Sequence, residues 1–220
     1  MKYDAVLDSY SGEALLAVFA EGGERCFAAT APMRGREAAK LPVWVERELG
    51  EHGLKLADIG RWTVGAGPGS FTGLRLAAAL VAGWCFGRKG VCRAVPGVLG
   101  VAQAAGIAPG ETLGCLYDGR NRELIHLPVT REATGKLRLA AEPEILDAAA
   151  AERRFARPDA PKRFAALAAD LPALRKLVPH LEIAAVPAPD PDALQRDEAP
   201  FDDDVTRLVY IRPAVYTEPR

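Results

Sequence analysis

The chain has 220 residues and a mass of 23.5 kDa, with 49% hydrophobic and 26% charged residues. This composition is typical of a folded globular protein and excludes an intrinsically disordered chain. The 28 Lys and Arg residues balance 29 Asp and Glu residues, so no global positive charge attracts a nucleic acid or an anionic membrane.

The first fifty residues predict three strands and a helix. Leu41, Val45 and Leu49 recur at helical spacing within residues 36–52, and Pro42 indicates that the helix either begins or bends at that point. The strands precede this helix as a β-meander, at residues 3–7, 14–19 and 25–29.

The next fifty residues predict strands that alternate with helices. The predicted strands are 61–65 and 91–95, and the predicted helices are 72–87 and 98–105. The first half of the chain therefore has the predicted order βββαβαβα, which is an α/β arrangement with parallel pairing of the strands that flank helices.

A Pro- and Gly-containing stretch at residues 106–110 predicts a boundary between two subdomains, residues 1–105 and 106–220. In the second subdomain, strands at 113–117 and 123–129 surround a turn. Residues 145–181 are rich in Ala and Arg and predict helices broken by prolines. The Pro- and acid-rich residues 186–200 predict an extended, solvated segment.

A glycine-rich segment between the predicted strand 61–65 and the helix 72–87 is the strongest local motif. Its glycines permit positive φ angles and close backbone approach, and the amides at a helix N-terminus favour an anion. Two interpretations stand equally: a phosphate or nucleotide loop, and a tight turn that docks a helix against its strand. The segment matches neither a Walker loop nor a dinucleotide fingerprint. Its candidate residues are Gly65, Gly67, Pro68, Gly69, Ser70, Thr72, Gly73 and Arg75.

Two further groups of polar residues are candidates for function. Asp8 ends the first predicted strand, where a carboxylate can face a metal or a phosphate, although a turn-forming role is favoured. Asp118, Arg120 and Glu123 form a charged turn that is either a contact surface or a solvated hairpin tip, and a contact surface is slightly favoured.

Neither metal nor hydrolase chemistry has a local signature. His52, His126 and His180 are scattered singly, so no metal site is expected. Ser70 does not lie in a GxSxG motif. The cysteines form no CxxC pair and are expected to be buried thiols in a reducing compartment; they are Cys26, Cys85, Cys92 and Cys115.

The chain is expected to be cytoplasmic. Its longest apolar stretch, 76–86, is about half of the roughly 20 residues that a membrane-spanning helix needs. Asp4 and Asp8 interrupt the region where a secretory signal is apolar.

A cluster of basic residues follows the predicted boundary between the subdomains. It is either part of a surface that contacts RNA or the solvated face of a helix, and the second interpretation is favoured. The cluster consists of Arg153, Arg154, Arg157, Lys162 and Arg163.

The glycine-rich segment 64–75, followed by Pro96-Gly97-Val98-Leu99, resembles the TsaB (YeaZ) family. Shorter motifs agree with this family: Val6-Leu7-Asp8-Ser9, Leu41-Pro42, Asp118-Gly119-Arg120 with Glu123, and Val209-Tyr210-Ile211-Arg212-Pro213. The sequence departs from the family pattern at Tyr10, at Arg34-Gly35-Arg36, at Gly119 and at Leu124-Ile125.

The resemblance implies an actin-like, Hsp70-like (ASKHA) fold of two α/β subdomains and no independent catalytic activity. Family members pair with the related catalytic subunit TsaD. With the ATPase TsaE, they support threonylcarbamoyladenosine formation at position 37 of tRNAs that read codons beginning with A. The resemblance places the TsaD interface on two apolar helices, at Leu41, Val45, Leu49, Leu76, Leu80 and Trp84.

The expected consequences for ligands follow from this role. No cofactor is expected to bind tightly, and ATP or ADP is expected only in the complex. The tRNA is expected to bind indirectly, through the complex, and the chain alone can form a homodimer through its exposed apolar surface. The alternatives are an M22-type metallopeptidase, a small-molecule kinase of the same superfamily, or a free-standing nucleotide-binding module.

Overall fold

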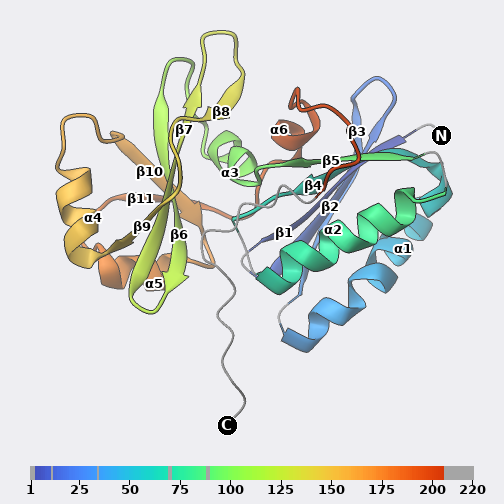
Figure 1. The fold of residues 1–220 in the computed structure, drawn as a ribbon, viewed down its shortest axis with the longest axis horizontal. Helices are drawn as coiled ribbons and strands as arrows, with labels where there is room; N and C mark the ends of the chain where they lie inside the picture. Colours follow the sequence, from blue (N-terminus) through green and yellow to red (C-terminus); the bar gives the residue numbers. More distant parts are fainter. Residues whose placement is uncertain (1–2, 11, 34, 69–70, 88–89, 206–220) are drawn as a thin grey trace.

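The computed structural model describes residues 3–10, 12–33, 35–68, 71–87 and 90–205, which form two α/β halves (Figure 1). Each half is built on one sheet. The first sheet has the strand order β3-β2-β1-β4-β5, and the second has the order β11-β10-β6-β7-β8, with β9 beside β7. None of the helices in the described residues combines the length and the apolar character needed to cross a bilayer.

The first half has the predicted order βββαβαβα, which is confirmed. Strand β1 pairs antiparallel with β2 and parallel with β4, and β4 pairs parallel with β5. Pro42 lies in the first turn of α1, where its missing N–H removes no helical hydrogen bond, so the helix begins there and is not bent. The elements are β1 (Tyr3–Tyr10), β2 (Glu13–Ala20), β3 (Arg25–Pro32), η1 (Gly35–Lys40), α1 (Leu41–Glu51), η2 (Leu56–Asp58), β4 (Ile59–Gly65), α2 (Phe71–Cys85), β5 (Val91–Val95) and α3 (Val98–Ala104).

The second half opens with two long antiparallel strands, β6 and β7, close to the predicted positions. The rest of its sheet is added by shorter strands, and β10 pairs parallel with both β6 and β11. The elements are β6 (Thr112–Arg120), β7 (Glu123–Arg131), β8 (Leu137–Leu139), β9 (Glu144–Asp147), α4 (Ala148–Phe155), β10 (Arg163–Leu167), α5 (Leu171–Leu177), β11 (Ile183–Val186) and α6 (Pro191–Gln195).

Two predictions in the second half are wrong. Residues 145–181 are not helical throughout, because β10 runs between α4 and α5; four of its five residues are buried, which gives the apolar run of an interior strand. Residues 186–200 are not simply extended and solvated. Asp190 caps the short helix α6 through its side chain, and Leu194 of this helix is fully buried.

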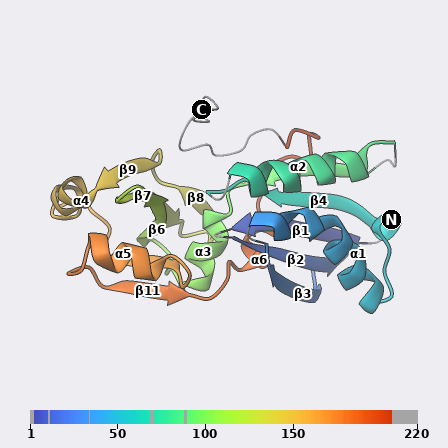
Figure 2. The same cartoon turned by 90° about the horizontal axis from the view of Figure 1, so that it is seen from below.

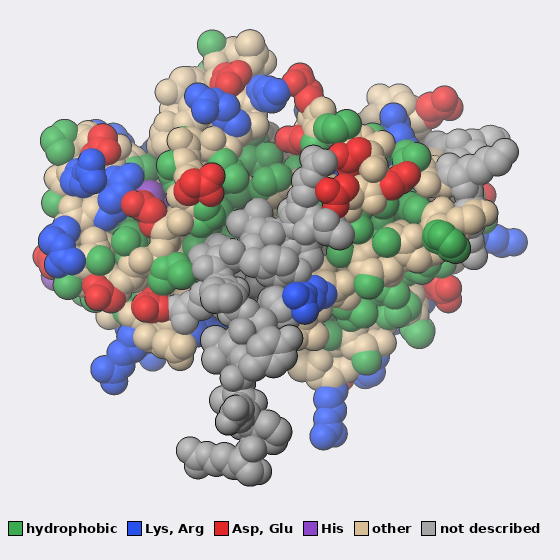
Figure 3. Space-filling model, viewed as in Figure 1, with side chains coloured by type: hydrophobic (Ala, Val, Ile, Leu, Met, Phe, Trp, Pro, Cys, Tyr) green, Lys and Arg blue, Asp and Glu red, His purple; other side chains and the backbone are tan. Residues whose placement is uncertain are grey.

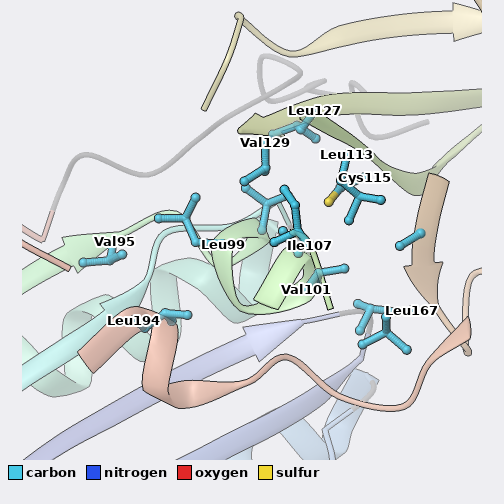
Figure 4. Packing of buried hydrophobic residues seen from close by; sticks show 14 of the residues in the cluster. Val95, Leu99, Val101, Ile107, Leu113, Cys115, Leu127, Val129, Leu167 and Leu194 are labelled. Carbon is cyan, nitrogen blue, oxygen red and sulfur yellow. The ribbon is translucent and has the colours of Figure 1, made fainter. Parts of the chain in front are cut away.

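The helices form three layers around the two sheets (Figures 1 and 2). Helices α1 and α2 cover the outer face of the first sheet, and α4 and α5 cover the outer face of the second. Helices α3 and α6 lie between the sheets and contact each other. Figure 4 shows this middle layer, where Leu99 and Val101 of α3 pack with Leu194 of α6 and with Leu127 of β7.

The chain after α6 returns to the first sheet and is held there by Arg93. This buried side chain on β5 donates hydrogen bonds to the Thr63 hydroxyl and to the backbone carbonyls of Leu194, Gln195, Asp197 and Ala199. The Phe201 ring lies 4.3 Å from its guanidinium. Residues 194–201 therefore strap the second half onto the inner face of the first sheet.

Candidate functional site

The glycine-rich segment leaves β4 at the edge of the sheet where β1, β4 and β5 have their carboxyl ends. The Ala66 N–H donates to the Val95 carbonyl at 2.7 Å, and the Gly97 N–H donates to the Gly67 carbonyl at 2.8 Å. Gly67 has a φ of 98°, a conformation that favours glycine. These bonds fix the segment onto the connection between β5 and α3.

Asp8 lies beneath this segment and is almost completely enclosed, with 1% of its surface exposed. A Cβ atom on Gly65 would lie 1.9 Å from Asp8 Oδ1, and a Cβ atom on Gly97 would lie 2.7 Å from Oδ2. At both positions the Asp8 carboxyl fills the space that a Cβ atom would need, so only glycine fits there. The prediction that the glycines allow close backbone approach is confirmed at Gly65.

The surroundings of the Asp8 carboxyl disfavour its ionised form. Its Oδ2 atom has no hydrogen-bond partner in the part of the chain that the structure describes. Burial raises the pKa of Asp8 to about 6, although a hydrogen bond from the Ser9 backbone opposes the shift. Burial also raises the pKa of Tyr117 on β6 well above its usual value, with contributions from Cys115 and from Asp8.

The nucleotide and metal that an actin-like fold implies do not fit Asp8 in this arrangement. The backbone of Gly65 and Gly97 covers the carboxyl, and among the described residues no three His, Cys, Asp or Glu side chains come together as metal ligands. The geometry thus favours the helix-docking interpretation of the segment. Nucleotide binding elsewhere in a complex stays a prediction.

The other candidates in the glycine-rich segment are distributed unevenly. Thr72 and Arg75 on the first turn of α2 are exposed, whereas Gly73 is buried. Pro68 is buried and follows a cis peptide bond. Gly69 and Ser70 lie outside the described residues, as does the C-terminal motif 209–213.

The charged turn after β6 is built by local contacts. The Asp118 carboxylate accepts a hydrogen bond from the Arg120 N–H at 2.9 Å, and Arg120 lies opposite Glu123 in the register of β6 with β7. Arg120, Asn121 and Arg122 have φ values of 60°, 49° and 61°, so the tip is a left-handed turn. A Cβ atom on Gly119 would lie 2.9 Å from the Glu123 carbonyl oxygen, which explains the glycine there.

The predicted partner interface divides between core and surface. Leu41, Val45 and Leu49 are at most 1% exposed and pack against the first sheet, so the structure assigns them to the core of the chain. The half-buried residues of α2, which are Leu76, Leu80 and Trp84, stay predicted contacts. Val43 of α1 and Phe86 after α2 are 70% and 87% exposed and were not predicted.

Sequence reasoning also missed a partly buried polar cluster beside α4, in which His126 is enclosed and Glu144 and Arg154 reach the surface. His126 Nδ1 lies 2.8 Å from Glu144 Oε2, and Arg154 Nε lies within 3.2 Å of both Glu144 oxygens. Burial lowers the pKa of His126, and its bond with Glu144 only partly offsets this. Burial pushes the pKa of Glu144 up, but His126 and Arg154 hold it below its usual value. The only sequence signal was the position of His126 on the same face of β7 as Leu124.

The exposed thiol was not predicted either. Cys85, Cys92 and Cys115 are buried as expected, but Cys26 is exposed on β3, the edge strand of the first sheet.

Two α/β halves that share a middle helical layer define a protein of the actin-like, ASKHA class. The ethanolamine utilization protein EutJ from Carboxydothermus hydrogenoformans has this fold, with a TM-score of 0.53, 12% identity, and coverage of 89% of this chain and 90% of that one. A Pseudomonas aeruginosa protein described as similar to peptidase YEAZ gives a TM-score of 0.68 at 23% identity, with 88% of each chain covered.

YeaZ from Pseudomonas aeruginosa matches with a TM-score of 0.65 and 25% identity, over 88% of this chain and 89% of that one. The family model of TsaD, tRNA N6-adenosine threonylcarbamoyltransferase, matches residues 36–181. The chain therefore belongs to the TsaD family, as a member of the TsaB (YeaZ) type. This membership supports a role related to tRNA modification. A comparison with curated proteins gave no match.

Proposed function

We propose that the chain is a non-catalytic subunit that binds a TsaD-type catalytic subunit. In this role it supports the formation of threonylcarbamoyladenosine at position 37 of tRNAs that read codons beginning with A. Family membership supports the reaction, and the enclosed Asp8 carboxyl supports the absence of a catalytic group at the glycine-rich segment.

The surface of α2 is the observation that carries this proposal. After Arg75, the helix has no charged residue through Cys85. Its exposed positions include the small residues Ala79 and Gly83, flanked by half-buried Leu80 and Trp84. Figure 3 shows hydrophobic side chains gathered over α2. Small residues between larger apolar ones allow a second helix to approach closely, and an apolar patch of this kind marks a protein interface.

The TsaD-type subunit is the occupant that we propose for this surface, because the TsaD family model matches residues 36–181 of this chain and the two proteins are therefore related. A second copy of this chain can occupy the same surface when the partner is missing. We propose that a TsaE-type ATPase, and ATP or ADP, join through the complex rather than through this chain alone.

Size-exclusion chromatography with light scattering tests the proposal, using the chain mixed with its cognate TsaD-type protein. Ala79→Glu places a charge on the exposed face of α2, where it would be buried by the partner, and we expect it to abolish the one-to-one complex. Ala149→Glu is the matched control, because Ala149 is an exposed alanine on α4. No complex with the unchanged chain, or equal complex formation by both variants, would contradict the proposal.

A further inference from the structure

Positive charge is concentrated in one part of the second half. Residues 148–177 contain seven Lys and Arg residues and three acids, whereas residues 178–205 contain one basic residue and eight acids. The near-neutral net charge of the whole chain hides this separation. A local surplus of this size creates a positive field over one face of the molecule.

Four of these cations lie on α4 and α5, Arg157 and Lys162 lie in the connection from α4 to β10, and Arg163 begins β10, where it donates to the Ala105 carbonyl at the end of α3. Helices α4 and α5 cover the same face of the second sheet, where they share one apolar cluster with Leu116 and Phe164. Figure 3 shows Lys and Arg side chains along this end of the molecule, interspersed with acids. The exposed cations on these helices and on the adjoining turns and strand start, together the α4–α5 layer, are Arg122, Arg153, Arg157, Lys162, Arg163, Arg175 and Lys176.

The basic residues of this layer fall into two groups. Three of them form ion pairs: Arg154 with Glu144, Arg157 with Asp159, and Arg163 with Glu111. No described acidic side chain forms an ion pair with the second group, which is Arg122, Arg153, Lys162, Arg175 and Lys176. The first group forms ion pairs within the chain, whereas the charges of the second group can interact with a ligand.

Two hollows lie at the opposite ends of α4. One has a volume of about 530 Å³ and is lined by Arg154, Lys162 and Thr112 among others; its acids, Glu111 and Asp159, are already paired with arginines. The other has a volume of about 520 Å³ and is lined by Arg122 and Lys176 beside the first residues of α4; its one acid, Asp147, accepts a hydrogen bond from the Ala150 N–H as the cap of α4. Because a helix rises about 1.5 Å per residue, the eight residues of α4 separate the hollows by ~12 Å.

We propose that the α4–α5 layer binds the phosphate backbone of RNA, and that it contacts the tRNA directly in the complex described above. Two cationic hollows set apart along a helix suit a polymer of phosphates better than one small anion. This inference rests on the proposed function, because the substrate of that complex is a tRNA. It differs from the expectation that the tRNA binds only through the partner.

An anionic membrane is the competing polyanion, and the surface disfavours it. Membrane-surface segments combine cations with exposed aromatic or aliphatic side chains. Among the described residues, the large hydrophobic side chains with the greatest exposure, Val43 and Phe86, belong to the first half. Only Ile145, at 39% exposure, lies near the cationic layer.

The test measures the affinity of the two-protein complex for an unmodified tRNA transcript, by fluorescence anisotropy across a range of salt concentrations. The variant Lys162→Glu/Lys176→Glu reverses one unpaired cation in each hollow. We expect it to weaken tRNA binding by about tenfold and to make the slope of log affinity against log salt shallower by about two. Lys136→Glu/Arg138→Glu is the matched control, with the same change in charge around β8, and we expect tRNA binding close to that of the unchanged complex.

The outcomes separate this inference from the proposed function. Light scattering first establishes that each variant forms the complex; failure of the unchanged chain to form it would count against the proposed function. An intact complex whose tRNA affinity and salt slope equal those of the control would overturn the inference. So would binding of the complex to phosphatidylserine vesicles that Lys162→Glu/Lys176→Glu abolishes while tRNA affinity is unchanged.

Discussion

The two outer helical layers occupy equivalent places in the fold but present opposite surfaces. Helix α2 presents Ala, Gly, Leu and Trp on the outside of the first half, beside α1 with its exposed Glu46, Arg47 and Glu51, whereas α4 and α5 present unpaired Lys and Arg on the outside of the second half. The architecture is the same, so it does not select the partner. The exposed side chains select the partner: those of α2 suit a protein, and those of the α4–α5 layer suit RNA.

The apolar layer depends on the glycine-rich segment that positions α2, so Gly65→Ala is the largest disruption we predict. The added Cβ would lie 1.9 Å from Asp8 Oδ1 and 2.1 Å from its Cγ. We expect the free energy of unfolding, measured in urea, to fall by about 3 kcal/mol or more. Gly83→Ala is the control, because nothing lies within 4 Å of that position. Equal stabilities of the two variants would refute the close contact.

Asp8→Asn tests the same contact with the opposite sign. The folded-state pKa of about 6 lies above the unfolded value near 3.8. The free energy of unfolding of the native chain therefore falls as the pH rises through this interval. We expect the variant to be more stable than the native chain by about 3 kcal/mol at pH 8, and the difference to vanish near pH 4. Thermal unfolding at several pH values measures this, and a difference independent of pH would contradict it.

The second half is predicted to respond to acid in the opposite direction. Burial lowers the pKa of His126, so the folded state favours the neutral ring, and stability is lost as the pH falls through the unfolded value near 6.5. We expect His126→Gln to lower stability at pH 8 but to reduce the further loss between pH 7 and pH 5. An unchanged pH profile of unfolding would mean that His126 does not titrate in this range.

The smallest predicted effect concerns the cationic layer itself. Lys162 and Lys176 are exposed and have no acidic partner among the described residues. Lys162→Glu/Lys176→Glu is therefore expected to change the free energy of unfolding by less than about 0.5 kcal/mol. A larger loss would assign these lysines to the fold instead of to a ligand.

The first half was predictable because its elements each carry their own pattern. Leu41, Val45 and Leu49 predicted α1, and the glycine-rich segment marked the junction of β4 with α2. The apolar stripe of Leu41, Val45 and Leu49 did not distinguish core residues from partner contacts, because a helix buries one apolar face against its own sheet whether or not a partner binds. The exposed face of α2 needed the structure.

The missed features depend on contacts between distant segments. The enclosure of Asp8 arises where Gly65 and Gly97 meet over β1, and neither glycine reveals this by its own neighbours. The prolines and acids around α6 predicted a solvated linker. The sequence contains no sign that Leu194 is buried or that Arg93 donates hydrogen bonds to the Leu194 and Gln195 carbonyls. Strand β10 was hidden in an Ala-rich region whose pattern fits a buried helix equally well.

Hydrogen exchange measured by mass spectrometry most directly tests the assignment of one partner to each layer. The chain would be compared alone, with its TsaD-type partner, and with partner and tRNA. We predict that the partner slows exchange in residues 71–85 and leaves residues 148–177 unchanged, and that tRNA then slows exchange in 148–177. Slower exchange in 148–177 on addition of the partner protein, with 71–85 unchanged, would contradict the assignment of the two layers.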